Sequence, residues 1–188
     1  CADVTGVQTC ALPIQGATKG NVFLRTKQYT LSEDEDIALH LSKLFIAGKI
    51  FNSRNVLRRF IRDNGKDEDV EYAAKQLDWC RKSVTETDCM DILRGEEGHA
   101  ANVYYGVFNH LILNQKSDFS FEGRSRRPPK DEVNAMLSFV YTLIANDVAA
   151  ALESVGLDPY VGFMHTLRPG RTSLALDMME ELRAYLGD

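Results

Sequence analysis

The sequence has few cysteines, no excess of basic residues and no long apolar run, and each shortage excludes a class of protein. Its four cysteines lack the spacing of metal ligands, so we expect reduced cytosolic thiols. The net charge of −5 excludes a protein that binds nucleic acid through its overall composition, and any such role must rest on local basic patches. No apolar run approaches the length of a membrane span, so we expect a cytoplasmic protein without a membrane partner.

What remains is typical of a single helical domain with a real core. The chain has 188 residues, of which 44% are hydrophobic and 26% are charged. Apolar periodicity and capping signals predict a mainly α fold of about five helices. A capping box at Ser32–Glu35 precedes the first, and Asn64 and Gly65 end it. The predicted helices cover about residues 33–63, 67–83, 88–113, 131–154 and the segment that follows residue 172.

The first thirty residues do not read as part of the helical domain. Residues 1–14 resemble the translation of a sequencing-library adapter, which predicts a non-native segment; a genuine short N-terminal strand is the alternative. Residues 21–29 alternate partly between apolar and polar side chains, which predicts one strand. The fold class expected is therefore mainly α with a short β remnant at the N-terminus.

A histidine and two carboxylates are candidate metal ligands near the C-terminus. His165 lies in a Pro/Gly loop that enters a helix through Thr172 and Ser173, both good N-caps. Asp177 and Glu180 follow three residues apart, so their carboxylates can reach one point. This mixed nitrogen and oxygen set suits Mg²⁺, Mn²⁺ or Zn²⁺. The alternative is an ordinary solvated face, because both acids lie opposite the apolar stripe of their helix.

Glu97 is a fourth candidate, because helical periodicity places it inside an apolar stripe. Steps of 100° per residue put its side chain between Leu93 and Ala101. An unpaired carboxylate in such a stripe costs several kcal/mol. Glu97 therefore requires a cation, a metal or a raised pKa.

Local basic patches offer candidate phosphate contacts. The loop over residues 114–130 ends in a stretch without acids that contains Arg124, Arg126, Arg127 and Lys130. Such a loop is either merely solvated or a contact for nucleic-acid phosphates. The arginines between residues 54 and 62 have two equal interpretations, as cations matched to a helix C-terminus and as contacts to a DNA backbone.

Four motifs, in order, resemble the CRISPR-associated Cas1 family, which is the spacer-acquisition endonuclease and integrase. The version resembled most is that of subtype I-C, and the match runs from about Gly20 to the last residue. The resemblance implies that residues 15–30 are the remnant of an N-terminal β domain, that residues 31–188 are a helical catalytic domain, and that both ends are truncated. The motifs are GEEGHAA at 95–101, RPPKDEVNAMLSFVY at 127–141, GLDPYVGFMH at 156–165 and SLALDMMEELR at 173–183.

The resemblance also implies a function and its residues. Mg²⁺ or Mn²⁺ would be held by Glu97, His165 and Glu180, with Asp177 as a second ligand, a water-holder or a group behind the ligands. The expected reaction is phosphodiester transfer, in which a DNA 3′-hydroxyl attacks the CRISPR repeat and a new spacer is integrated; the same site can cut branched DNA. The expected partners are DNA, a second copy of the chain and the small Cas2 protein. Arg168 and Arg171 flank His165 and are candidates to hold the scissile phosphate; the alternative is that they serve only the solubility of the loop.

Two other classes stay open. One is a non-catalytic helical module that binds protein or DNA. The other is a metal-dependent phosphohydrolase that acts on small molecules. The complete set of four candidate ligands argues against the first class, and the arginine-rich loop argues against the second, because it offers a long surface for tracking phosphates.

Overall fold

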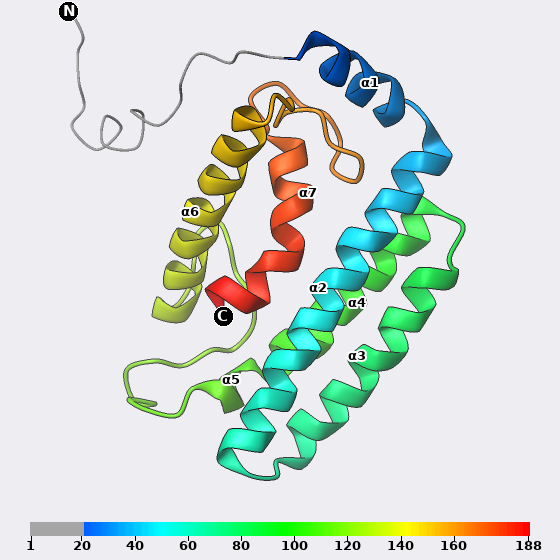
Figure 1. Cartoon of the computed structure of the whole chain (residues 1–188). Helices are drawn as coiled ribbons and strands as arrows, with labels where there is room; N and C mark the ends of the chain where they lie inside the picture. Colours follow the sequence, from blue (N-terminus) through cyan, green and yellow to red (C-terminus); the bar gives the residue numbers. More distant parts are fainter. Residues whose placement is uncertain (1–20) are drawn as a thin grey trace, which may run out of the picture.

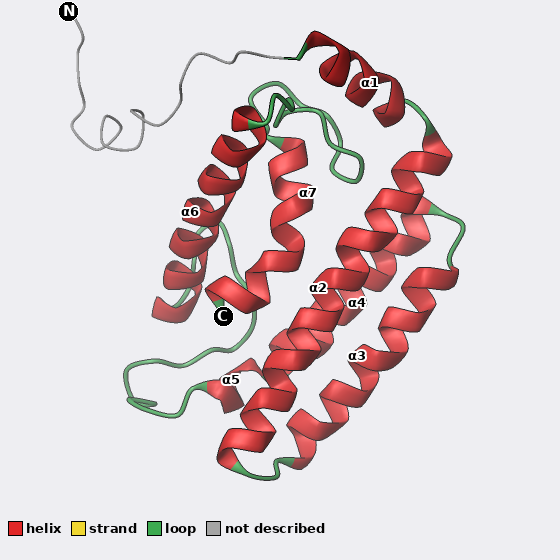
Figure 2. Ribbon diagram, in the orientation of Figure 1, coloured by secondary structure: helices red, strands yellow, loops and turns green. Residues whose placement is uncertain are grey.

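The computed structural model describes residues 21–188 and contains only helices among its regular elements (Figures 1 and 2). The predicted mainly α class is confirmed, and the five predicted helices correspond to α2, α3, α4, α6 and α7. The segment 1–14, predicted to be adapter-derived, lies outside the described residues. The elements are α1 Val22–Ser32, α2 Glu35–Asn64, α3 Glu68–Glu86, α4 Met90–Gly106, α5 Phe108–Leu111, α6 Glu132–Ser154, α7 Ser173–Leu182 and a π-helical turn Arg183–Gly187.

The strand predicted over residues 21–29 is wrong, because this segment forms α1. Asn21 caps the helix by accepting hydrogen bonds from the backbone amides of Phe23 and Leu24. A helix satisfies its own backbone groups, whereas a lone strand has no partner in a domain without a sheet. The buried Gln28 then anchors α1 by donating to the carbonyls of Asp158 and Val161, at 2.8 and 2.9 Å.

Two predicted helix boundaries also differ. Asp34, not Ser32, caps α2, by accepting a hydrogen bond from the Ile37 amide at 3.1 Å. The helix expected over 88–113 breaks after Gly106 and continues as the short α5. At the break the Val107 amide bonds to the Tyr104 carbonyl, three residues back, which tightens the last turn. Gly65, with φ of +96°, ends α2 as predicted.

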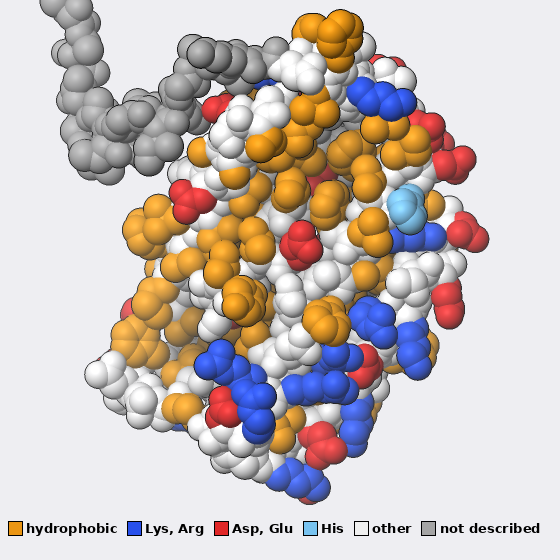
Figure 3. Space-filling view, viewed as in Figure 1, with side chains coloured by type: hydrophobic (Ala, Val, Ile, Leu, Met, Phe, Trp, Pro, Cys, Tyr) orange, Lys and Arg blue, Asp and Glu red, His pale blue; other side chains and the backbone are white. Residues whose placement is uncertain are grey.

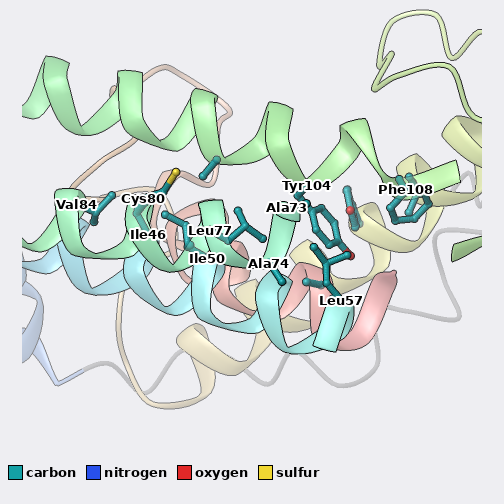
Figure 4. Packing of buried hydrophobic residues seen from close by; sticks show 14 of the residues in the cluster. Ile46, Ile50, Leu57, Ala73, Ala74, Leu77, Cys80, Val84, Tyr104 and Phe108 are labelled. Atoms are coloured by element: carbon teal, nitrogen blue, oxygen red, sulfur yellow. The ribbon is translucent and has the colours of Figure 1, made fainter. Parts of the chain in front are cut away.

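The core lies between α2, α3 and α4, which pack side by side (Figure 4). Apolar residues four and seven positions apart on α2 face α3, which is the helical period read from the sequence. Two small residues of α3, Ala73 and Ala74, allow α2 and α3 to approach closely. The side chains that are fully buried here include Ile46, Ile50, Leu57, Val70, Leu77, Val84 and Leu93.

Helix α7 lies between α2 and α6 (Figure 1) and contacts both of them. It buries Leu174, Ala175 and Met179, but its opposite side is covered as well. A helix enclosed on two sides has no solvated face for its charged residues. This position is what places its two acids inside the protein.

Helix α6 is long and apolar enough to cross a membrane by length and composition alone, contrary to the expectation from the sequence. Only part of it packs against the domain, through a stripe that includes Val133, Leu137 and Tyr141. Apolar side chains on its other side, such as Phe139, are exposed. Figure 3 shows apolar side chains gathered along the left side of the visible face, where Figure 1 places α6. A packed helix of this composition passes the same test, so the feature is weak support for a membrane span.

Candidate metal centre

Asp177 is completely buried (0% exposed) and organises the loop before α7. Its Oδ2 accepts hydrogen bonds from the amides of Phe163 and Met164, at 2.7 and 3.0 Å. Its Oδ1 accepts from the amide of His165 at 3.0 Å and contacts the imidazole Nδ1 of the same residue at 2.6 Å. The alternative of a solvated face is therefore wrong for Asp177. Both of its oxygens form hydrogen bonds to the loop that carries His165.

His165 is held in a defined orientation by this contact. Because the buried carboxylate accepts, Nδ1 carries the proton and Nε2 is the nitrogen with a free lone pair. A carboxylate behind an imidazole is the usual arrangement for fixing the tautomer of a metal-binding histidine. Of the roles considered for Asp177, the geometry thus favours that of a residue that orients His165 and does not itself bind the metal.

Glu180 is also buried (2% exposed), one turn further along α7. Its Oε1 receives the Arg183 guanidinium at 2.8 Å, and its Oε2 lies 2.8 Å from the Nζ atom of Lys49 on α2. The same Nζ atom lies 2.5 Å from Oε1 of Glu97 on α4. Lys49 therefore bridges the two carboxylates and ties α4 and α7 to α2.

The charges in this cluster stabilise one another. Burial alone would lower the pKa of Lys49, but the carboxylates of Glu180 and Glu97 outweigh it and hold that pKa above its ordinary value. Burial would raise the pKa of Glu180, but the cations of Lys49 and Arg183 outweigh it and hold that pKa below its ordinary value. Both groups are therefore charged near neutral pH.

The structure brings the four predicted residues into two linked pairs rather than one tight ring. Asp177 holds His165 directly, while Glu97 and Glu180 meet through Lys49. His165 also contributes to the lowered pKa of Glu180. Within residues 21–188, the group of ligand atoms that all lie within 4.8 Å of one another is a different one, formed by Asp67, Asp69 and His110.

That second cluster is explained by helix capping. Asp67 precedes α3, and its Oδ1 accepts hydrogen bonds from the amides of Asp69 and Val70. Its Oδ2 lies 2.8 Å from Nδ1 of His110, which comes from α5. The His110 contact and the cap together lower the pKa of Asp67. No local pattern indicates this cluster, because His110 lies 43 residues from Asp67 in the sequence.

The sequence analysis did not identify Lys49 as a site residue, although its position in the sequence indicates a buried lysine. It stands between Ile46 and Ile50 in an apolar stretch of α2, where a lysine needs a partner as much as Glu97 does. The cation that the sequence analysis demanded for Glu97 is this lysine. Pairing the two would have required knowing that α2 and α4 are neighbours.

The donor atoms fit a hard divalent cation. Two carboxylates and one imidazole nitrogen are suitable ligands for Mg²⁺ or Mn²⁺. Glu180 Oε2 is buried, and among the described residues its contact is the ammonium group of Lys49 at 2.8 Å. A buried carboxylate oxygen that is held by a single cation is suited to bind a metal ion in the place of that cation.

A cavity of about 530 Å³ adjoins the cluster. Lys49 and Glu97 form part of its wall, and Tyr105 and Phe121 supply aromatic surface. The remaining charged groups are mostly basic, which favours an anionic ligand. The basic residues that line it, besides Lys49, are Arg124, Arg126 and Arg183.

The predicted phosphate-binding arginines differ in their surroundings. Arg124 is held by Asn134, whose Oδ1 accepts from its Nη1 at 2.7 Å, and it stacks over Tyr141. Arg126 and Arg127 are exposed on the same loop, and Arg168 is exposed beyond His165. Arg171, also predicted to contact phosphate, is half-buried. Their DNA contacts stay predictions.

The arginines of α2 are paired with acids. Arg54 and Arg58 both contact Asp78 of α3, and Arg59 and Arg62 contact Asp63. Figure 3 shows Lys and Arg side chains gathered over the lower half of the visible face, where the C-terminal half of α2 lies. Their pairing favours the interpretation as structural cations over that of a free DNA-binding row.

Asn134→Ala is expected to loosen the basic loop and lower the free energy of unfolding by about 1–3 kcal/mol. Asn134 is completely buried, and its amide bonds to Gly123, Ser125 and Asp131. Limited trypsin digestion should show faster cutting after Arg126. Unchanged cutting and an unchanged urea midpoint would contradict this role, and Thr142→Ala, an exposed change on the same helix, is the control.

The fold and the site define a helical domain with a candidate divalent-metal centre beside a basic cavity. Family comparison makes this specific: the family described as CRISPR associated protein Cas1 matches residues 6–188. The chain belongs to that family. The match begins inside the segment predicted to be adapter-derived, which stays a prediction.

Individual relatives agree with the family. The chain is 48% identical over 178 residues to the CRISPR-associated endonuclease Cas1 1 of Chlorobaculum tepidum, covering 93% of this chain and 52% of that protein. It resembles a chain of a partial Cas6-RT-Cas1–Cas2 complex with TM-score 0.77 and 27% identity, over 90% of this chain and 49% of that one. A casposase bound to integration product has TM-score 0.73 and 27% identity, over 87% and 47%. The chain spans about half the length of the curated relatives it matches.

Proposed function

We propose that this chain carries the metal-dependent catalytic centre of a DNA endonuclease and integrase that inserts new spacers into the CRISPR array. The observation that carries the proposal is the pair of carboxylates, Glu97 and Glu180, joined through Lys49 beside a basic cavity. The oriented His165 is near enough to Glu180 to influence its pKa. Family membership and the printed names of the endonuclease relatives support it.

The ligands of the metal would be Glu97, Glu180 and Nε2 of His165. Mg²⁺ or Mn²⁺ supplies a Lewis acid that stabilises the charge of a phosphodiester in transfer. Asp177 keeps the proton on Nδ1 of His165, so that Nε2 is left as the lone-pair donor. Arg183 holds one oxygen of Glu180 and thereby fixes the direction of the other.

The DNA would be bound through its phosphates. The exposed Arg126 lines the cavity and is followed in the same loop by the exposed Arg127. Arg168 and Arg171 follow His165. Arg124 supports the loop from behind through Asn134 while its side chain lines the cavity. Such contacts position a duplex without reading its sequence.

The partners proposed are those of the relatives. One structural neighbour is a complex that contains Cas1 and Cas2, and another is a casposase bound to integration product. We propose DNA, a second copy of the chain and Cas2 as partners, in the cytoplasm. The resemblance to the subtype I-C version stays a prediction.

Cleavage of a fluorescent branched DNA duplex with Mn²⁺ tests the function. His165→Ala and Glu97→Gln should each lower the rate by about 100-fold or more, because losing a ligand should exceed the ~10–100-fold typical of an outer-shell partner. Asp147→Asn, an exposed acid of α6, should cut like the parent. EDTA should stop every variant.

Other outcomes assign the other classes. DNA binding without cutting by the parent, with or without Mn²⁺, would favour a non-catalytic module. Equal hydrolysis of a small phosphodiester, with no preference for DNA, would favour a phosphohydrolase. Cutting that survives EDTA or both substitutions would refute the metal centre.

A further inference from the structure

Lys49 occupies the centre of the carboxylate cluster. Its Nζ atom lies 2.5 Å from Glu97 Oε1 and 2.8 Å from Glu180 Oε2, and its side chain is almost buried. These oxygens belong to two of the three proposed metal ligands. One ammonium group therefore stands in the space between two carboxylates that a divalent ion would need to share.

We propose that Lys49 is an internal cation that holds Glu97 and Glu180 together before a metal ion binds, and that it competes with the metal for them. This inference rests on the proposed metal centre. It makes Lys49 a positioning residue, which acts through the ligands rather than on the substrate.

Because of their charges, a metal ion and the ammonium group of Lys49 compete for the two carboxylates and do not share them. Two carboxylates face Lys49 and Arg183. Two cations a few ångströms apart repel each other more strongly in a partly buried setting than in water, and the repulsion is greater for a divalent ion. A metal ion between Glu97 and Glu180 therefore has to move the ammonium group away.

A metal ion can replace the ammonium group of Lys49 at Glu180. Glu180 Oε2 lies 2.8 Å from the ammonium nitrogen, and no other donor contacts this oxygen in the described part of the chain. A metal ion at this oxygen supplies the same attraction with twice the charge. Arg183, in contrast, binds the other oxygen of Glu180 and can stay in place.

The displaced ammonium group has a place to go. Lys49 lines the adjoining cavity of about 530 Å³, together with Arg124 and Arg126. A lysine reaches different positions by rotating its four-carbon stem, without movement of the helix. The stem of Lys49 can therefore turn into the cavity while α2 keeps its core contacts.

The experiment compares the 188-residue chain with Lys49→Met by calorimetric titration of Mn²⁺ and by thermal unfolding. Without metal, Lys49→Met should have a lower Tm, because two carboxylates lose their shared cation. Its affinity for Mn²⁺ should rise by at least about tenfold, since no ammonium group has to be displaced. The Tm gain on adding Mn²⁺ should be larger than in the parent.

Lys43→Met is the matched control. Lys43 lies on the same helix and pairs with Asp88, outside the cluster. Its Tm and its affinity for Mn²⁺ should equal those of the parent. If Lys49→Met does not fold, Lys49→Gln takes its place, because its amide can still donate to a carboxylate.

The results separate this inference from the proposed function. If the parent binds Mn²⁺ and the Lys49 variant binds it equally or more weakly, the competition is refuted and the metal centre stands. If neither folded protein binds Mn²⁺, the competition and the metal centre both fail. Binding by the variant alone would support the competition most directly.

Discussion

Replacing Asp177 with alanine is expected to lower the free energy of unfolding by about 3–5 kcal/mol. The carboxylate accepts hydrogen bonds from three consecutive backbone amides, those of Phe163, Met164 and His165. These amides lie in the partly buried segment of the loop before α7, so removing the acceptor leaves donors without partners. Each unsatisfied buried donor costs about 1–3 kcal/mol, which sets the size of the effect.

Urea unfolding followed by circular dichroism measures this loss. Asp177→Asn should give an intermediate loss, because one oxygen still accepts while the new NH₂ group faces other donors. The control is Asp147→Ala, an exposed acid of α6, which should stay within about 0.5 kcal/mol of the parent. A loss below about 1 kcal/mol for Asp177→Ala would show that the loop finds other acceptors, contrary to this account.

The helices were predictable because their signals are local. The apolar period of α2 and the turn at Asn64 and Gly65 depend only on neighbours in the sequence, and the structure confirms both. Asp67 and Asp131 each precede a helix and cap it. The strand over residues 21–29 failed because a short, partial alternation does not distinguish a strand from a helix, and only a sheet partner would have decided it.

The candidate site was predictable where one helix defined it. Glu97 was identified from its position in an apolar stripe, and the structure supplies the cation that such a carboxylate needs. Asp177 and Glu180 could not be settled in this way. Both lie opposite the apolar stripe of α7, and only the packing of α2 and α6 on its two sides shows that they are buried.

Lys49 and Arg124 show what sequence patterns leave out. The role of Lys49 depends on α4 and α7, which lie far from it along the chain, so no local pattern predicts the bridge. Arg124 was predicted as a free phosphate contact from the charge of its loop. In the folded chain its guanidinium is engaged by Asn134, a residue that the sequence analysis could not connect with it.

Gly162→Ala is expected to destabilise the protein by about 3 kcal/mol or more, because a methyl group has no space there. A Cβ atom at Gly162 would lie 2.5 Å from Asp177 Oδ2, 2.7 Å from the Ser173 carbonyl carbon and 2.9 Å from the Leu174 amide nitrogen. Two of these three atoms are backbone at the start of α7, so no side-chain rotation relieves the contact. The loop must lift from the helix, which lengthens its hydrogen bonds to Asp177.

Gly95→Ala is the matched control, because the same methyl group is added where nothing lies within 4 Å. Gly95 is an exposed residue inside α4, where alanine should raise stability by about 0.5–1 kcal/mol. Urea unfolding should therefore give opposite signs for the two glycine variants. A neutral result at Gly162 would mean that the loop does not press on α7, and the orientation of His165 would then need another cause, since the same loop carries its backbone amide to Asp177.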